Sequence, residues 1–271
     1  MTEVMRSRPF AGRDGARCGF RRRASDGSAR GALASARVMD VSLVIPAHNE
    51  RDNIPTLVDA CREAVSGFEG SHEIIVIDDG STDGSGELLR EIGEGEPMLR
   101  VIAHAPGENI GCHPSEIVGL KAATGDVMVF LPADLQIHPN VTPAFVEAAG
   151  RADIVASHRV NRADNAMRRF ISAVNNRVER MVIGVDVNDA HSSMAFTRRA
   201  VDELIPSVVS QSALIPAEIL LRAHRKGISV TEIEIEHFPR VAGRQTGATL
   251  SEIAGVQLDL LRLRRTVARE G

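Results

Sequence analysis

The chain has 271 residues, of which 43% are apolar, so it can bury a substantial core as one large domain or as a domain with an appendage. Its net charge of -4 gives no global basic field, and no nucleic-acid partner is expected. The chain has neither Trp nor Tyr, so the stacking platforms that hold long sugar chains or single-stranded nucleic acid are largely missing, and a small polar ligand is favoured.

The first 37 residues contain nine arginines and many glycine, alanine and serine residues, without apolar periodicity. This composition is typical of a disordered basic arm, which we place at residues 1–38. The arm lacks the apolar centre of a secretory signal. An alternative is that translation begins at Met39, just before the first predicted strand; the intact mass of protein made from the native gene distinguishes the two.

Two features bear on location. No later segment reaches 18 uninterrupted apolar residues, so no transmembrane helix is expected. The three cysteines are too scattered for a disulfide framework or a metal-ligand pair, which predicts reduced thiols in a cytoplasmic protein.

From residue 41 onward, short apolar runs alternate with helical periods. The apolar runs predict strands at 41–45, 73–77, 99–104 and 126–131. Helical spacing predicts helices at 53–65, 87–92 and 114–123. Strands that alternate with helices favour right-handed crossovers, so we expect an α/β fold with a mainly parallel central sheet and helices on both faces.

Three polar loops follow predicted strands: PAHNE (46–50), DDGSTD (78–83) and PADLQIH (132–138). Ligands bind outside the carboxyl ends of such strands, so the three loops are expected to form one site. Neither G-x-G-x-x-G nor G-x-x-x-x-G-K-[ST] is present, which disfavours a dinucleotide or P-loop site. The loops are rich in carboxylates, which can accept hydrogen bonds from a base or ribose or hold a divalent cation. We interpret Asp79 and Asp134 as functional and Asp83 as an ordinary turn residue.

Five segments in order then carry a resemblance to a known family. They are VSLVIPAHNERDNI, IIVIDDGSTDGS, NIGCHPSEIVGLKAATGDVMVFLPADLQIHP, DIVASHR and PAEILLRAHRKGISVTEIEIEHFPRVAGR. Together they resemble family 2 glycosyltransferases of the dolichyl-phosphate mannosyltransferase-like branch. The resemblance implies a GT-A-type three-layer sandwich, which we place at residues 39–248.

The resemblance also implies roles for individual residues. The nucleoside-binding positions correspond to Pro46, His48, Glu50, Ile77 and Asp79. The diphosphate and metal motif corresponds to Pro132, Ala133, Asp134 and Gln136, with Asp134 and Gln136 as the metal ligands. The arginines expected at the sugar-nucleotide phosphates are Arg159, Arg240 and Arg244. The residues implied to be catalytic are Asp134, Glu218 and Arg240.

Two positions depart from the family pattern. Pro132 stands where the family usually has the first metal-binding Asp, so the expected Mg²⁺ or Mn²⁺ site is weakened by one anionic ligand. In the late motif, Gln245 and Thr246 replace the usual Ser-Lys, and we interpret Arg244 as the substitute cation.

The resemblance implies transfer of a sugar from a UDP-, GDP- or dTDP-linked donor to a polyprenyl phosphate or a small soluble acceptor, with inversion. A hydroxyl acceptor needs a general base, whereas a lipid phosphate is already an anion at neutral pH. Glu218 is the first candidate for that base and Asp189 the second. Glu218 has an alternative role as the helical partner of Arg222, four residues on.

Two further segments bear on the acceptor. The pattern at 166–184 is compatible with a helix at a membrane surface or with a helix packed on its own domain. Residues 249–271 are expected to form an amphipathic helix. A peripheral membrane contact is compatible with both segments, and the sequence indicates no oligomeric state.

Other classes fit less well. A processive polysaccharide synthase would need the tryptophan of its Q-x-x-R-W signature. A sugar-1-phosphate nucleotidyltransferase would need a glycine-rich, lysine-bearing loop after the first strand. The remaining alternative, suggested by Pro132, is a weak or inactive sugar-nucleotide-binding GT-A protein.

Overall fold

The computed structural model describes residues 39–160, 182–211, 213–238, 259–260 and 262–267. The described residues all belong to one compact unit. The predicted arm at 1–38, most of the predicted helix at 166–184, Arg240 and Arg244 lie outside the described residues. Within the described part of the chain, no helix is long and apolar enough to cross a membrane.

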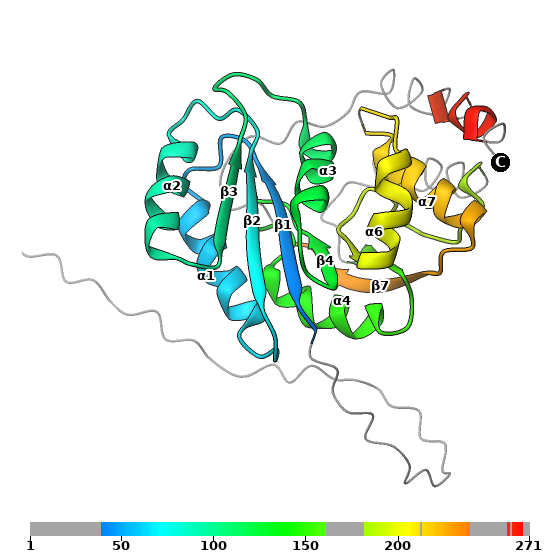
Figure 1. Ribbon diagram of the computed structural model, residues 1–271, viewed down its shortest axis with the longest axis horizontal. Helices are drawn as coiled ribbons and strands as arrows, with labels where there is room; N and C mark the ends of the chain where they lie inside the picture. Colours follow the sequence, from blue (N-terminus) through cyan, green and yellow to red (C-terminus); the bar gives the residue numbers. More distant parts are fainter. Residues whose placement is uncertain (1–38, 161–181, 212, 239–258, 261, 268–271) are drawn as a thin grey trace, which may run out of the picture. The chain divides into compact units, whose positions relative to one another are not determined.

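Seven strands form one sheet in the order β3-β2-β1-β4-β6-β5-β7 (Figure 1). The strands are β1 (Val41–Ala47), β2 (His72–Asp78), β3 (Leu99–Ala103), β4 (Val127–Phe130), β5 (Ile154–Val160), β6 (Met194–Thr197) and β7 (Val230–Glu236). All pairings are parallel except those of β6, which runs antiparallel to both β4 and β5. The predicted mainly parallel sheet is confirmed.

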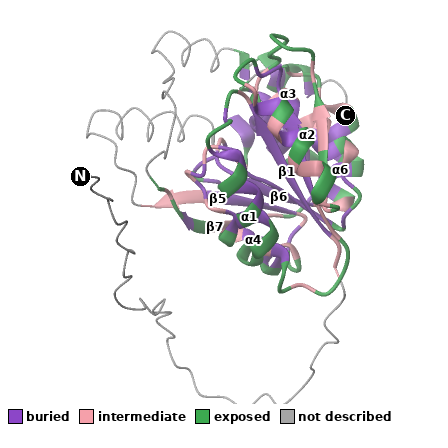
Figure 2. Cartoon of the chain, turned by 90° about the vertical axis from the view of Figure 1, so that its left-hand side faces the viewer, coloured by how far each residue is buried: buried purple, intermediate pink, exposed green. Residues whose placement is uncertain are grey.

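Helices cover both faces of this sheet. They are α1 (Ile54–Val65), α2 (Ser85–Gly95), α3 (Cys112–Ala122), α4 (Thr142–Ala149), α6 (Arg198–Leu204) and α7 (Ile215–Lys226), with short 3-10 turns η1 (Pro139–Val141) and η2 (Ile205–Ser207). One apolar core contains side chains of α1, α2 and α4, and the other contains side chains of α3, α6 and α7. The central strands are buried between these layers, and the outer faces of the helices are exposed (Figure 2).

Alternation along the strands divides their side chains between the two cores. In β1, Leu43 and Ile45 enter the core with α1, whereas Val44 enters the core with α3. Helix α3 lies close to the sheet at Gly119, where an added Cβ would be 2.7 Å from Ile77 Cδ1. The expectation of two covered faces is therefore confirmed, with each strand contributing to both cores.

The register of the strands places three loops at one level. Ala47, the last residue of β1, pairs with Asp78 at the end of β2, and Asp78 pairs with Ala103 at the end of β3. Strand β4 runs parallel to β1 on the other side. The loops that follow these strands therefore begin side by side at the carboxyl edge of the sheet.

Candidate active site

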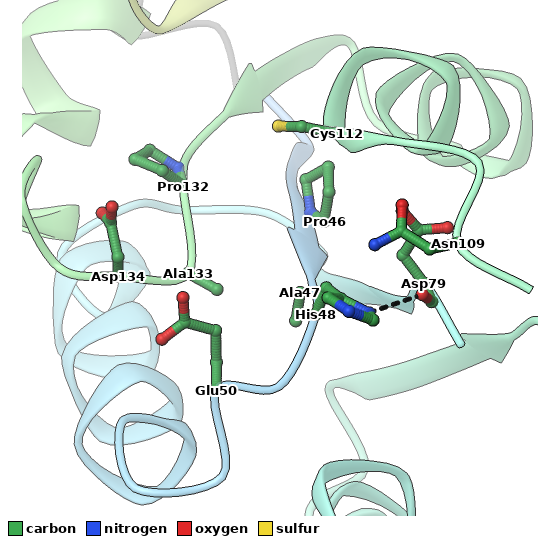
Figure 3. A pocket seen from close by; sticks show the side chains of 10 residues that line it. All are labelled: Pro46, Ala47, His48, Glu50, Asp79, Asn109, Cys112, Pro132, Ala133 and Asp134. Atoms are coloured by element: carbon green, nitrogen blue, oxygen red, sulfur yellow. Dashed lines mark hydrogen bonds between the residues drawn. The ribbon is translucent and has the colours of Figure 1, made fainter. Parts of the chain in front are cut away.

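A pocket of about 290 Å³ opens at this carboxyl edge, close to the lower end of the range for small-molecule sites. Its lining residues come from the end of β1, from the loops after β1, β2, β3 and β4, and from the first residue of α3. They are drawn in Figure 3: Pro46, Ala47, His48, Glu50, Asp79, Asn109, Cys112, Pro132, Ala133 and Asp134. Asp134 and Glu50 lie on one side of the pocket, and Asp79 and Asn109 lie on the other. The structure thus brings together residues from all three polar loops that the sequence singled out.

Asp79 is buried and fully engaged by the loop between β3 and α3. Its Oδ1 accepts the backbone N–H of Ile110 at 2.9 Å, and its Oδ2 accepts that of Gly111 at 2.8 Å. His104 Nδ1 lies 3.0 Å from Oδ1. Burial raises the pKa of the Asp79 carboxyl, but the hydrogen bonds from these donors outweigh burial and hold the pKa below its ordinary value. Asp79 therefore presents a fixed negative charge beside the pocket.

The loops after β1 and β2 are hydrogen-bonded to each other. His48 Nδ1 donates to the backbone carbonyl of Asp79 at 2.8 Å. Asn49, in the left-handed region with φ 55°, donates its N–H to Ser81 Oγ and accepts the N–H of Thr82 on its Oδ1, both at 2.9 Å. Asn tolerates this conformation better than most residues. Together these bonds hold the loops after β1 and β2 against each other, where the nucleoside is predicted to bind.

The loops after β2 and β3 meet at Gly80. Gly80 has a φ of +70°, and an added Cβ would lie 2.8 Å from the backbone nitrogen of Glu108 and 2.9 Å from the carbonyl oxygen of Ala105. The carbonyl of Gly80 accepts the N–H of Gly107 at 2.9 Å. Only glycine satisfies both the conformation and the close approach.

Glu50 forms part of the pocket wall opposite Asp79 (Figure 3). Its side chain is buried, and its Oε2 accepts a hydrogen bond from Asn53 Nδ2 at 2.5 Å. Its backbone N–H donates to Ser85 Oγ at 3.1 Å. These bonds position the Glu50 carboxylate at the start of α1.

The loop after β4 alternates between buried and half-buried positions. Ala133 and Leu135 are buried, whereas Pro132, Asp134 and Gln136 are half-buried. Leu135 has a φ of 58°, an uncommon left-handed conformation for a residue other than glycine, and the N–H of Gln136 donates to Asp134 Oδ1 at 3.1 Å. Pro132 and Asp134 both line the pocket, so a carboxylate at position 132 would stand beside that of Asp134.

The donor set fits a metal ion that is shared with a ligand. In the described part of the chain, no group of three or more His, Cys, Asp and Glu side chains is arranged to hold an ion. Mg²⁺ commonly uses one or two protein carboxylates and takes its other ligands from water and substrate phosphates. The half-buried Asp134 carboxylate at the pocket can supply such a ligand.

Besides Ala47 of the PAHNE loop, two pocket residues were not predicted to be functional, Asn109 and Cys112. Both lie in the segment NIGCH, which was quoted for the resemblance, but no spacing rule indicated that it would reach the loops after β1 and β4. The Cys112 thiol points toward Pro132 across the pocket (Figure 3). Although the residue as a whole is exposed, its thiol is buried, and this burial raises its pKa to about 12. The nearby carboxylates of Glu116, Asp134 and Asp79 contribute smaller increases in the pKa. The thiol is therefore neutral at physiological pH, which disfavours it as a nucleophile or metal ligand.

A histidine and a buried glutamate follow Cys112 on the first turn of α3. His113 Nδ1 lies 3.0 Å from Glu116 Oε2, and the His113 ring packs near the rings of Phe130 and His191. This pair joins the start of α3 to the end of β4. No local sequence pattern indicated this pair.

Among the described residues that were expected to bind the nucleotide sugar, three do not line the pocket. The Ile77 side chain is fully buried beneath α3. Gln136 accepts the N–H of Phe238 on its backbone carbonyl at 2.9 Å. Arg159 forms an ion pair with Asp189, with 2.7 Å between Nε and Oδ2. The roles implied for these residues stay predictions.

Glu218 lies in a buried ion pair and does not line the pocket either. Its Oε1 accepts a hydrogen bond from Arg222 Nε at 2.7 Å, and its carboxylate also accepts the N–H groups of Val209 and Ser210 at 3.1 and 2.8 Å. Burial raises the pKa of Glu218, and the hydrogen bonds from Ser210, Arg222 and Val209 lower it to a net value below the ordinary one. The alternative in which Glu218 pairs with Arg222 is thus realised in the structure.

Comparison with known proteins decides the family. The family model described as Glycosyl transferase family 2 matches residues 42–205, more than half of the chain. The chain belongs to this family.

Curated relatives of this family 2 glycosyltransferase are longer than this chain and share one name. The undecaprenyl-phosphate 4-deoxy-4-formamido-L-arabinose transferase of Yersinia pestis bv. Antiqua (strain Angola) is 31% identical over 225 residues, which cover 83% of this chain and 67% of the relative. The enzyme of the same name from Pectobacterium carotovorum subsp. carotovorum (strain PC1) is 32% identical with the same coverage. The chain therefore spans about two thirds of the length of these relatives.

Solved structures agree on the fold. Glucosyl-3-phosphoglycerate synthase from Mycobacterium tuberculosis, in complex with Mn²⁺, UDP and phosphoglyceric acid, has a TM-score of 0.62 at 19% identity and covers 84% of this chain and 78% of its own. The same enzyme in complex with Mg²⁺ and UDP has a TM-score of 0.60 at 18% identity, covering 84% and 79%. The predicted GT-A fold is confirmed by these neighbours and by the sheet described above.

Proposed function

We propose that this family 2 glycosyltransferase moves a sugar, with inversion, from a nucleotide-sugar donor to a polyprenyl phosphate. The observation that carries the donor half is the pocket in which the loops after β1, β2 and β4 bring Asp79, Glu50 and Asp134 together. The carboxylates of Asp79 and Glu50, which face each other across the pocket, suit the N–H and hydroxyl groups of a nucleoside. Asp134 lies on the opposite side of the pocket from Asp79 and is proposed to contact the diphosphate and its cation.

The acceptor half rests on the curated relatives, whose names specify undecaprenyl phosphate. A phosphate acceptor is already anionic and needs no group to remove a proton. The buried, ion-paired state of Glu218 is consistent with a reaction that uses no base at that position. A small hydroxyl acceptor, by contrast, would require a base.

Charge on the leaving group identifies the groups that accelerate the reaction. Breaking the sugar–phosphate bond places negative charge on the nucleoside diphosphate, so cations there stabilise the transition state more than the ground state. We assign Asp134, with Gln136, to hold Mg²⁺ or Mn²⁺ against the diphosphate. Arg159, Arg240 and Arg244 are proposed as further phosphate contacts, since guanidinium groups suit diphosphate oxygens.

A second candidate, a weak or inactive sugar-nucleotide-binding protein, is favoured by Pro132. The side chain lines the pocket beside Asp134 and supplies no ligand atom. The two candidates differ in turnover, not in nucleotide binding.

Nucleotide release from UDP-, GDP- and dTDP-sugars, with undecaprenyl phosphate and Mn²⁺ or Mg²⁺, separates them. We expect release that depends on the lipid phosphate and that falls by about two orders of magnitude or more in Asp134→Ala. Asp52→Ala, which removes an exposed carboxylate near the same edge, serves as the matched control. Pro132→Asp is expected to lower the metal concentration needed for half-maximal activity, because it adds a hard anionic ligand.

The outcomes are distinct. Nucleotide binding without turnover on any acceptor favours the inactive alternative. Wild-type activity in Asp134→Ala contradicts the assignment of Asp134.

A further inference from the structure

Three large apolar side chains are exposed among the residues that the structure describes. They are Ile110, Val209 and Phe238, with 47%, 61% and 40% of their surface accessible. Single exposed apolar residues are common and need no explanation. All three lie toward the same edge of the sheet, and each is held by a backbone hydrogen bond to a residue of the predicted site. We refer to them as the edge residues.

The edge residues lie toward the carboxyl edge of the sheet. Ile110 is in the loop between β3 and α3, which follows the carboxyl end of β3. Phe238 follows β7. Strand β6 is antiparallel to both β4 and β5, so β4 and β5 run in the same direction. Because β4 is parallel to β1 and β7 is parallel to β5, β7 runs in the same direction as β1. Val209 precedes α7. Helix α7 ends at Lys226, shortly before β7 begins at the amino edge of the sheet. The start of α7, near Val209, therefore lies toward the carboxyl edge.

Each edge residue is also tied to a residue that the sequence assigned to the site. The hydrogen bonds run from Ile110 N–H to Asp79 Oδ1 at 2.9 Å, from Val209 N–H to Glu218 Oε1 at 3.1 Å, and from Phe238 N–H to the Gln136 carbonyl at 2.9 Å. Two of the acceptors are buried carboxylates whose bonds to N–H groups are charge-assisted. The loops that expose these apolar side chains are therefore held in place by groups at and beside the site.

We propose that the edge residues insert into the surface of a lipid bilayer and hold the pocket against it. This inference rests on the lipid phosphate acceptor of the proposed function. A long polyprenyl chain stays in the bilayer and presents its phosphate at the surface, so a transferase must bring its pocket to that surface. Apolar side chains on anchored loops at the pocket edge supply attraction to the bilayer, whereas a protein partner docked there would cover the pocket.

Two triple variants of the full chain test the proposal. One carries Ile110→Ser, Val209→Ser and Phe238→Ser, and the other carries leucine at the same positions. The backbone N–H groups remain in both, so the anchoring bonds are kept. Their melting temperatures and nucleotide affinities are measured first, to show that fold and pocket are intact.

Binding is then measured by co-sedimentation with phosphatidylcholine vesicles, with and without undecaprenyl phosphate. The serine variant is expected to bind vesicles about a hundredfold more weakly than wild type. This estimate assumes that each of the three partly inserted side chains contributes about fivefold to the affinity. The leucine variant is expected to bind about as well as wild type, because insertion depends on apolar area and not on shape. Equal binding by wild type and the serine variant, absence of vesicle binding by wild type, or equal losses in both variants would each overturn the proposal.

Activity separates this inference from the proposed function. With undecaprenyl phosphate in vesicles, the serine variant should show a raised KM for the acceptor, whereas with a short, water-soluble prenyl phosphate it should match wild type. Failure of wild type on both acceptors refutes the lipid phosphate acceptor, while the vesicle-binding result still decides the role of the edge residues. An equal loss of activity on both acceptors in the serine variant would show that the edge residues act through the pocket and would overturn their docking role.

Discussion

Asp79 shows how one buried charge organises the pocket. Its two oxygens accept N–H groups from the loop after β3, while its own carbonyl accepts His48 from the loop after β1. Three loops thus converge on one residue. A buried carboxylate with these donors is stabilised in its charged form, which is why its pKa is lowered despite burial.

Asp79→Asn is expected to lower the free energy of unfolding by about 2–4 kcal/mol at neutral pH, because the amide loses charge-assisted bonds and turns an NH₂ group toward N–H donors. The folded pKa of Asp79 is lowered, so its contribution is present above the unfolded pKa of about 3.9 and is lost as pH falls through the folded value. The difference between wild type and variant should therefore narrow below about pH 4. Urea unfolding at several pH values measures it.

Asp59→Asn is the matched control, since its carboxylate on α1 is 72% exposed. It should change stability by less than about 0.5 kcal/mol. A difference for Asp79→Asn that stays constant down to pH 2 would contradict the lowered pKa.

Helix α7 contains a buried ion pair that also holds the loop before the helix. Glu218 and Arg222 lie four residues apart with side chains 0% and 6% exposed. The same carboxylate holds the backbone of Val209 and Ser210. The start of α7 and the loop before it are thus one structural unit, and a substitution at Glu218 acts on both.

Glu218→Gln is expected to destabilise the fold by about 3–5 kcal/mol, because a buried cation loses its partner while most of the packing stays. Adding Arg222→Met removes that cation and should restore much of the stability. If Glu218 has only this structural role, glycosyl transfer returns with the fold in the double variant. A double variant that is folded but inactive would instead support the catalytic role implied by the resemblance.

Glu203→Gln in α6 is the control for this series. Its partner Arg199 is also four residues away, but the side chains are 42% and 58% exposed. Only a few tenths of a kcal/mol are expected there.

The sequence predicted the elements of the first half better than those of the second. Strands β1 to β4 are apolar runs between turn residues, and the structure places each within two residues of the predicted bounds. Strand β6, Met194–Thr197, was not predicted because four residues give too little periodicity to distinguish a strand from a loop. Its antiparallel direction depends on tertiary pairing with β4 and β5.

For the site, the loops could be predicted and the details of contact could not. The positions of Asp79 and Asp134 after strands predicted that both lie at one edge of the sheet. Both line the same pocket, and their functional roles stay predictions. Asn109 and Cys112 were missed because their approach depends on the path of the loop between β3 and α3. The burial of Ile77 beneath α3 likewise follows from the packing at Gly119, which no local pattern indicates.

Binding of the nucleotide-sugar donor should be measurable as stabilisation of the whole folded chain. A ligand at about 100 times its Kd stabilises the fold by about 2.7 kcal/mol when it binds only the native state. At about 2–4 °C per kcal/mol, the correct nucleotide sugar should raise the Tm by about 5–10 °C. Thermal scans with UDP-, GDP- and dTDP-sugars identify the base.

Asp134→Ala provides the comparison. If the nucleoside contacts lie on the Asp79 side, the order of the Tm shifts among UDP-, GDP- and dTDP-sugars should be the same in this variant as in wild type. Adding Mn²⁺, however, should no longer increase the Tm shift of the variant. An unchanged metal effect in Asp134→Ala would show that the metal is held elsewhere.

The close approach at Gly80 has a consequence for how this enzyme can diversify. The loop after β2 can stay on the loop after β3 only while position 80 carries no side chain, and the second loop supplies the donors that hold Asp79. Insertions or substitutions in either loop would separate them and release the Asp79 carboxylate. Changes of specificity are therefore more readily accommodated around Pro132 and Asp134, where a new side chain meets the pocket without displacing a neighbouring loop.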